Sequence, residues 1–216
     1  MRPARLPPLL VLTDRRMSAA RGRDLPATVA RAVEGGARAV VLREKDLTAP
    51  ERAALAAQLR AVLAPVDGLL IAASDAGLGA DGVHLAQADP PVLGPGLVGR
   101  SCHDGAGLAR AADEGCAYAT LSPIFPTASK PGYGPALGLA GLARLVQGAG
   151  LPVYALGGVQ PANAGACRDA GAGGVAVMGT VMSAHDPAAA CADLLAAWRA
   201  PDLIPTHAPS MHEENP

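Results

Sequence analysis

The stretch GGARAVVL (residues 35–42) returns three times along the chain in altered form, as GADGVHL (79–85), GCAYATL (115–121) and GAGGVAVM (171–178). Each copy begins with glycine and small residues and continues as an apolar run. A glycine is typical of the end of a helix, and a short apolar run is typical of a buried strand. The repeat therefore predicts a series of steps from helix to strand along the sequence.

Eight short apolar runs occur in total, and most of them are continuous rather than alternating. The runs are Leu9–Leu12, Ala39–Leu42, Leu69–Ala73, Gly82–Leu85, Leu97–Val98, Tyr118–Leu121, Val153–Leu156 and Val175–Met178. Continuous runs are typical of strands buried on both faces, as in parallel sheets. Eight strands alternating with helices predict an α/β fold, a single (β/α)₈ TIM barrel. An open doubly wound sheet is the alternative, but it usually has fewer strands.

The helical patterns between these runs differ in length. The stretch Thr48–Glu51 is a capping box with a proline near the first turn, which predicts the start of a helix. Residues 75–80 are too few for a full helix, so we expect one abbreviated βα unit. We expect the barrel to form one catalytic domain over residues 1–200, and the polar, proline-rich residues 201–216 to form a disordered tail.

The composition excludes several classes of partner. The net charge is −1 and aromatic residues make up only 2% of the 216 residues, so neither a basic surface nor stacking platforms for nucleic acid are expected. An anionic membrane surface is excluded on the same charge argument. Of the 18 basic residues only two are lysines, Lys45 and Lys130, and the single phenylalanine, Phe125, lies close to the second.

The cysteines and the N-terminus predict a cytoplasmic protein. Four cysteines lie far apart in sequence without zinc-ligand spacing, at Cys102, Cys116, Cys167 and Cys191, so buried thiols in a reducing compartment are expected. The N-terminal residues lack the apolar core and cleavage site of a signal peptide, and no apolar run is long enough to span a membrane. A homo-oligomeric assembly is compatible with the sequence.

Charged side chains follow several of the predicted strands, at the barrel end where such folds place their chemistry. Arg43, Lys45 and Lys130 supply positive charge, and Asp75 and Asp89 are oxygen ligands of the type that Mg²⁺ takes together with substrate phosphates. A diphosphate that bridges them would explain cations beside carboxylates. The alternatives are a solvated charged turn for residues 43–46, and ordinary turn or helix-cap roles for the two aspartates.

Glycines follow the last two predicted strands. The pair Gly157–Gly158 precedes a helix start, which is typical of a backbone phosphate site but also of a plain tight turn. Ser101 is either a helix cap or a phosphate ligand. His84 lies within a strand and is interpreted as a core histidine, while His103 is interpreted as a loop or capping residue.

Six segments in order carry a resemblance to one known family. They are LREKD (42–46), GADGVHLAQAD (79–89), GRSCH (99–103), SPIFPTASKPGYGPALGL (122–139), ALGGV (155–159) and GVAVMG (174–179). Over about residues 8–200 the chain resembles thiamine phosphate synthase, and the PIFPTASK segment is the most specific part. That resemblance implies a (β/α)₈ barrel that joins 4-amino-2-methyl-5-hydroxymethylpyrimidine diphosphate to a thiazole phosphate, with Mg²⁺ as cofactor and release of pyrophosphate.

The resemblance also implies roles for individual residues, carried over by motif. The residues implied to hold the diphosphate are Arg43, Lys45, Lys130, Ser74 and Ser101. The residues implied to bind Mg²⁺ are Asp75 and Asp89. The residues implied to contact the thiazole phosphate are Thr127, Ser129, Gly158, Met178 and Gly179. The implied reaction is dissociative: pyrophosphate leaves first, so charge stabilisation by the cations and the metal replaces a strong general base.

Three positions depart from the family pattern and leave other functions open. Val41 stands where the family usually has Gln, Ser74 where it has Asn, and Gly179 where Ser is common. A barrel that binds thiamine phosphates without catalysis is therefore one alternative. A thiazole tautomerase is a second, but that relative typically has His where Pro123 stands, and proline cannot shuttle protons. A phosphosugar isomerase is a third, and it would need a different acid–base pair.

Overall fold

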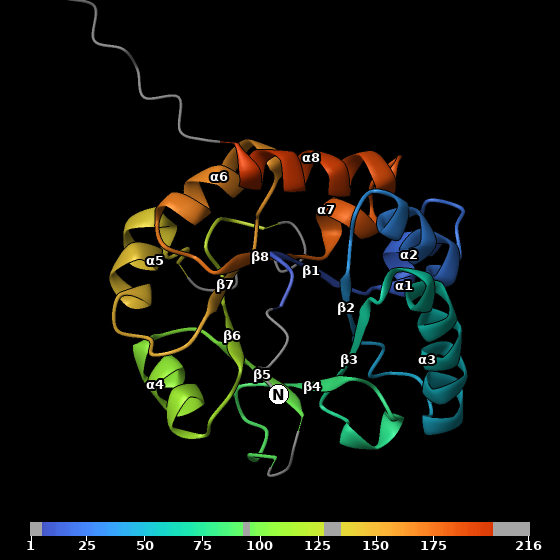
Figure 1. Ribbon diagram of the computed structural model, residues 1–216, viewed down its shortest axis with the longest axis horizontal. Coiled ribbons are helices and arrows are strands. Elements are labelled where there is room, and N and C mark those ends of the chain that lie inside the picture. Colours follow the sequence, from blue (N-terminus) through green and yellow to red (C-terminus); the bar gives the residue numbers. More distant parts are fainter. Residues whose placement is uncertain (1–5, 93–95, 128–134, 201–216) are drawn as a thin grey trace, which may run out of the picture.

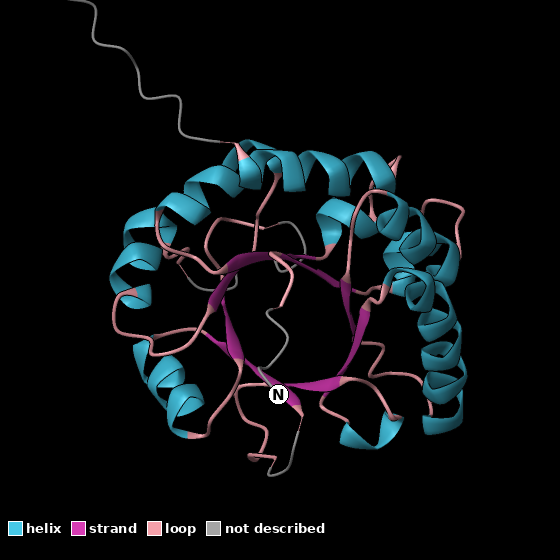
Figure 2. Ribbon diagram, in the orientation of Figure 1, coloured by secondary structure: helices cyan, strands magenta, loops and turns pink. Residues whose placement is uncertain are grey.

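The computed structural model describes residues 6–92, 96–127 and 135–200. Eight parallel strands close into a barrel in chain order, with the last strand paired to the first. The strands are β1 (Leu9–Leu12), β2 (Ala39–Leu42), β3 (Leu69–Ala73), β4 (Gly82–Leu85), β5 (Leu97–Cys102), β6 (Tyr118–Leu121), β7 (Val153–Leu156) and β8 (Gly174–Val177). Figures 1 and 2 show the barrel end-on inside its helices, so the predicted TIM barrel is confirmed.

Helices cover most of the outside of the barrel. They are α1 (Arg15–Ala19), α2 (Leu25–Glu34), α3 (Ala49–Leu63), α4 (Gly105–Asp113), α5 (Gly138–Val146), α6 (Pro161–Asp169), α7 (Gly179–Met182) and α8 (Pro187–Arg199), with 3₁₀ turns η1 (Ala64–Val66) and η2 (Ala76–Leu78). The predicted capping box is present at the start of α3, where the Glu51 carboxylate accepts hydrogen bonds from the Thr48 N–H and hydroxyl at 2.8 and 2.6 Å.

Two strands differ from their predicted bounds. β5 extends four residues beyond the apolar pair Leu97–Val98, because Arg100 and Ser101 are strand residues with polar partners rather than apolar ones. β8 ends at Val177 instead of Met178, whose backbone turns away to precede α7.

Two tyrosines fill the interior of the barrel. Tyr118 and Tyr154 are both buried and pack edge to face with their ring centroids 5.6 Å apart. Each needs a glycine on the neighbouring strand, because a Cβ added at Gly99 would lie 2.1 Å from the Tyr118 ring, and one at Gly174 would lie 2.2 Å from the Tyr154 ring. Val41, at one of the departures from the family pattern, also packs in this interior cluster.

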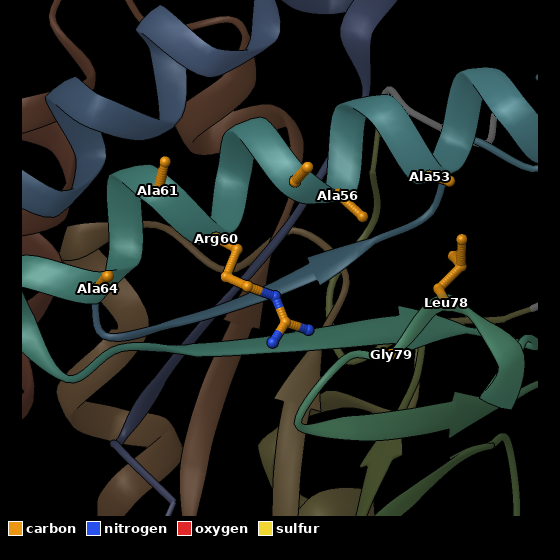
Figure 3. Close-up of a pocket in the computed structure, with 8 residues that line it drawn as sticks. Ala53, Ala56, Arg60, Ala61, Ala64, Leu78 and Gly79 are labelled. Carbon is orange, nitrogen blue, oxygen red and sulfur yellow. The ribbon is translucent and has the colours of Figure 1, made fainter.

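The ring of helices is thinnest beside β4 and β5 (Figure 1). As expected, the βα unit after β3 is abbreviated to η2, and the described part of the β4–β5 connection contains no helix. One flank of α3 is therefore left without a neighbouring helix. A shallow groove of about 460 Å³ runs there between the alanines of α3, Arg60, Leu78 and Gly79 (Figure 3). It lies on the outer flank of the barrel, against α3.

The four cysteines are buried and free, as expected. Burial raises the pKa of each thiol, to about 11 for Cys102 and Cys167 and about 12 for Cys191, so they are poor nucleophiles. Across the described ranges, every helix is too short or too polar to span a bilayer. The expected disordered tail, residues 201–216, lies outside the described residues.

Candidate active site

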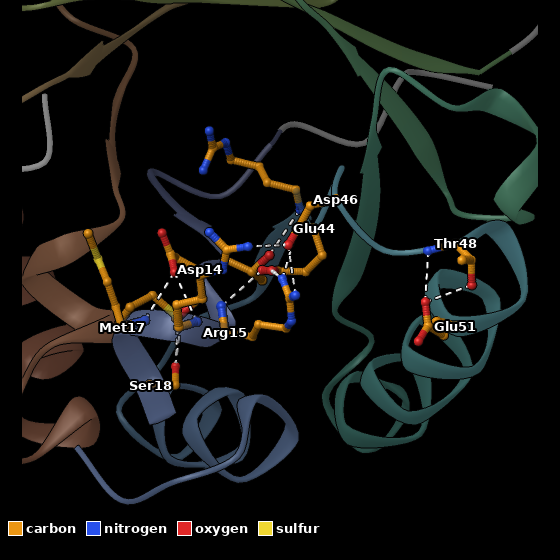
Figure 4. A network of polar contacts seen from close by, with 12 residues as sticks. Asp14, Arg15, Met17, Ser18, Glu44, Asp46, Thr48 and Glu51 are labelled. Atoms are coloured by element: carbon orange, nitrogen blue, oxygen red, sulfur yellow. Dashed lines mark hydrogen bonds and ion pairs between the residues drawn. The ribbon is translucent and has the colours of Figure 1, made fainter. Parts of the chain in front are cut away.

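In the loop after β2, the acidic side chains and the basic side chains point toward different partners. Glu44 and Asp46 point toward Arg15 of α1, which bonds Glu44 at 3.0 Å and both carboxylate oxygens of Asp46 at 2.7 Å (Figure 4). These bonds lower the pKa of Asp46 to about 2, so the carboxylate stays ionised. With both carboxylates held by Arg15, the alternating cations Arg43 and Lys45 are left for other partners. The sequence reasoning missed Arg15.

Lys45 is joined to Asp89 through one hydroxyl. The Lys45 ammonium donates to Ser74 Oγ at 2.7 Å, and Ser74 Oγ donates to Asp89 Oδ2 at 2.5 Å. Three consecutive strand ends, after β2, β3 and β4, are thereby tied into one chain of hydrogen bonds. The Ser74 bond is the main reason that the pKa of Asp89 lies below its usual value. The structure thus brings together three of the predicted site residues.

Ser74 adopts an unusual backbone conformation. Its φ is +55°, one of two positive values among the described non-glycine residues. Asn is several-fold enriched in this left-handed region, because its short side chain bonds to nearby backbone. Ser74 occupies this conformation with less intrinsic preference for it than an asparagine would have.

The two aspartates are held differently. Asp75 Oδ1 caps η2 by accepting from Gly77 N at 2.9 Å, and Oδ2 pairs with Arg52 of α3 at 3.1 Å. The capping alternative raised for Asp75 is thus present in the structure. Asp89 Oδ2 accepts from Ser74 and from Ala86 N at 2.8 Å. Among described residues its Oδ1 has no hydrogen-bond partner, so one carboxylate oxygen remains for a ligand.

A cation at this position would have few protein ligands. Within the described ranges, no cluster of three or more His, Cys, Asp or Glu side chains could hold a metal. Mg²⁺ commonly takes one or two carboxylates and completes its shell with water and substrate phosphates. The free Oδ1 of Asp89 fits that donor set, whereas both oxygens of Asp75 already accept from Gly77 and Arg52, and a site enclosed by protein alone is not formed among the described residues.

His84 lies inside the barrel beneath these charges. It is 6% exposed, with Nδ1 3.0 Å from the Tyr118 hydroxyl and Nε2 2.9 Å from Ser101 Oγ. Burial, together with the positive charge of Lys45 and Arg43, lowers the pKa of His84 to about 4. The histidine is therefore a neutral core residue with hydrogen-bond partners, as interpreted, and it fixes the position of Ser101.

His103 also takes the expected loop role. Its Nδ1 lies 2.7 Å from the carbonyl oxygen of Ser122.

The loops after β7 and β8 form the other side of the barrel mouth, the end of the barrel at which the strands terminate. This side consists mainly of backbone groups. Gly157 and Gly158 both have positive φ, +95° and +66°, and a Cβ at Gly158 would lie 2.6 Å from the Pro126 carbonyl oxygen. The Thr180 hydroxyl donates to the Val159 carbonyl at 2.7 Å, which joins the loop after β7 to α7. Gly179 opens α7 directly after Met178.

Arg43 lies between the two sides. Its backbone N–H donates to the Thr13 hydroxyl at 2.9 Å, and its guanidinium Nη1 lies 3.0 Å from the Met178 sulfur. The guanidinium thus reaches from the end of β2 to the end of β8. Thr127 is half-buried in the loop after β6. Ser129 and Lys130, which were also predicted, lie outside the described residues.

Sequence comparisons and one solved structure point to the same family. The family model for thiamine monophosphate synthase matches residues 9–181. A thiamine-phosphate synthase of Roseiflexus castenholzii is 39% identical over 194 residues, which is 83% of each chain. One of Methanoculleus marisnigri is 38% identical over 197 residues, covering 86% of this chain and 92% of its own. A thiamine phosphate pyrophosphorylase structure from Pyrococcus furiosus superposes with a TM-score of 0.78 at 28% identity, covering 88% and 94% of the two chains.

Proposed function

The chain belongs to the thiamine monophosphate synthase family, and from that premise we propose that it catalyses the synthesis of thiamine phosphate. The substrates would be 4-amino-2-methyl-5-hydroxymethylpyrimidine diphosphate and a thiazole phosphate, with pyrophosphate as the second product. The resemblance inferred from the sequence motifs is thereby confirmed at the level of the family.

The chain of hydrogen bonds from Lys45 through Ser74 to Asp89 is the observation that carries the proposal. A cation after β2 and a carboxylate after β4 are joined by the hydroxyl of Ser74 after β3, and Arg43 lies on the same loop as Lys45. A diphosphate needs cations for its own charge and a metal that bridges it to carboxylates. The arrangement of these side chains matches both needs, and Ser101 would add a hydroxyl donor next to them.

Asp75 and Asp89 would hold Mg²⁺, with the remaining coordination positions filled by diphosphate and water. When bound, the metal ion would supply Lewis-acid stabilisation of negative charge on the leaving group. Arg43, Lys45 and Lys130 would bind the diphosphate oxygens and stabilise the same charge from the protein side. Arg52, by holding Asp75, and Ser74, by holding Asp89, would orient the two carboxylates.

The glycine side of the mouth would receive the thiazole phosphate. The backbone N–H groups of Gly158 and Gly179 would donate to it, because the loops after the last two strands commonly bind phosphate in barrels of this type. Thr127, Ser129 and Met178 would complete this part of the site. Because bond breaking precedes bond formation in a dissociative reaction, the residues need to position the thiazole nitrogen and exclude water. No strong base is required, in keeping with the neutral, buried state of His84.

The proposal is tested by mixing the purified protein with both phosphorylated substrates and Mg²⁺. We expect thiamine phosphate and pyrophosphate to form in equal amounts, and chelation of the metal to stop both. Binding of the substrates without product formation at any protein concentration would overturn the synthase activity. The remaining interpretation would be a barrel that binds thiamine phosphates without catalysis. Lys130→Ala is expected to reduce turnover by orders of magnitude without unfolding the protein.

A further inference from the structure

Arg100 is a buried arginine on the outer face of β5. It is 1% exposed, and its neighbours Gly99 and Ser101 face the barrel interior. A buried guanidinium is costly unless it is fully paired. Here Nη1 donates to three carbonyl oxygens, those of Ala86 and Asp89 at 2.9 Å and that of Gln87 at 3.3 Å.

A second arginine reaches the same loop from α4. Arg110 donates to the Gln87 carbonyl at 2.9 Å and to the Asp89 carbonyl at 3.1 Å. Glu114 lies between the two guanidinium groups, 2.7 Å from Arg110 and 2.5 Å from Arg100. Burial alone raises the pKa of Glu114, but the bonds from Arg110 and Arg100 outweigh it and lower the pKa below its usual value.

The three side chains form a clamp around one short loop, and that loop carries Asp89. The backbone of the loop also closes on itself, because Asp89 N donates to the Ala86 carbonyl at 3.1 Å and Ala86 N donates to Asp89 Oδ2 at 2.8 Å. The clamp thus fixes the carbonyl side of the loop from outside the barrel. The carboxylate of Asp89 is left on the inner side, against Ser74.

We infer that Arg100, Arg110 and Glu114 are positioning residues that hold the loop of residues 86–89 in the conformation that presents Asp89 to the divalent cation. The inference rests on the proposed function, since Asp89 is a metal ligand only there. The clamp residues do not touch the substrate, and they act through the backbone carbonyls of the loop. Loss of the clamp should weaken metal binding while the chemical step at saturating metal is retained.

Arg110→Met is the variant that tests the clamp, because Arg110 is 43% exposed and its replacement leaves Arg100 paired. Arg31→Met is the matched control, since Arg31 is a helix arginine of 46% exposure that pairs with Glu34 and Asp186 far from the loop. Arg110→Lys keeps the charge but cannot reach two carbonyls and a carboxylate together. Each variant is measured by amide hydrogen exchange at Ala86 and Asp89, by Mn²⁺ titration with inorganic pyrophosphate followed by electron paramagnetic resonance, and by steady-state kinetics.

In Arg110→Met we expect faster exchange at both amides and a Kd for Mn²⁺ about 10-fold higher, in the range usual for residues that orient metal ligands. The metal concentration for half-maximal rate should rise equally, with kcat at saturating metal retained. Arg110→Lys should recover part of the loss, and Arg31→Met should match the wild-type protein.

Unchanged amide exchange, or faster exchange with an unchanged Mn²⁺ affinity, would overturn the positioning role. Absence of Mn²⁺ binding by the wild-type protein would overturn it as well. A wild-type protein that binds Mn²⁺ but forms no thiamine phosphate would contradict the proposed function alone, because the exchange and Mn²⁺ measurements still decide the role of the clamp.

Discussion

The two sides of the barrel mouth are built from opposite kinds of residue. After β2, β3 and β4 the site consists of long or charged side chains that hold one another, as in the chain from Lys45 to Asp89. After β7 it consists of Gly157 and Gly158, which have positive φ and would bring an added Cβ against the loop after β6, and after β8 the helix α7 begins at Gly179. The first side can stabilise charge that changes during a reaction, whereas the second can only receive a group of fixed shape. A substitution on the first side should therefore change mainly the catalytic rate. A substitution on the second side should change the stability of the protein and the fit of the substrate.

The largest effect is expected for Lys45→Met, on the charged side. Removal of a preorganised cation from the leaving group should lower kcat by about 100- to 1,000-fold with little change in thermal stability. Arg60→Met removes an exposed arginine from the groove beside α3 and serves as the control. Steady-state kinetics and a melting curve measure both variants. Equal turnover in the two would break the contrast between the sides.

A loss of stability is expected for Gly158→Ala, on the glycine side. An alanine at φ +66° is strained by about 1–2 kcal/mol, and its contact with the Pro126 carbonyl adds about 1–3 kcal/mol of overpacking. Gly79→Ala is the matched control, because Gly79 has φ +61° and nothing within 4 Å of an added Cβ. Denaturant unfolding should show the greater loss for Gly158→Ala. Equal losses would mean that the loop after β6 does not constrain this glycine.

The pH dependence of stability should report on His84. The folded-state pKa of His84, about 4, lies below the ordinary 6.5, so between these values the unfolded chain binds a proton at this residue and the folded protein does not. The stability that His84 contributes is therefore fully present above pH 6.5 and is lost as the pH falls from 6.5 toward 4. The free energy of unfolding should decrease by about 3 kcal/mol over this interval from this group. His84→Gln should flatten the profile. A profile unchanged by His84→Gln would contradict burial as the cause.

The smallest effect is expected at Ser74. Ser74→Ala removes the hydroxyl that joins Lys45 to Asp89, and turnover should fall about 10-fold, the cost of a lost hydrogen bond between charged groups. Ser74→Asn keeps a donor and an acceptor and suits φ +55° better, so it should retain activity and gain a little stability. Kinetics and denaturant unfolding of the two variants separate conformation from hydrogen bonding. If Ser74→Asn is as slow as Ser74→Ala, the hydroxyl itself is required.

The strand order and the positions of the strand ends could be predicted from the sequence, because buried parallel strands are continuous apolar runs with glycine before them. This was enough to place Arg43, Lys45, Asp75 and Asp89 at one end of the barrel. The pattern failed at β5, where Arg100 breaks the apolar run. Most of its partners are backbone carbonyls of the loop after β4. Because every residue has a carbonyl, the sequence does not indicate which of them Arg100 binds.

The residues that hold the site were missed for a related reason. Arg15 and Arg52 belong to helices, and only the folded chain shows that they pair with Asp46 and Asp75. The one available indication in the sequence was Arg100, a charged residue in a strand that otherwise has no charged residue. The positive φ of Ser74 was hidden as well, since serine gives less indication of that conformation than asparagine or glycine does.

The tyrosine-filled interior closes the axis of the barrel to solutes. Tyr118 and Tyr154 occupy the centre of the barrel, and the Tyr154 hydroxyl donates to the carbonyls of Leu6 and Pro7 near the start of the described chain. Solutes cannot pass from one end of the barrel to the other through its axis. In the proposed reaction, the two substrates and the two products would therefore enter and leave at the same end of the barrel. A product must leave before the next substrate can bind.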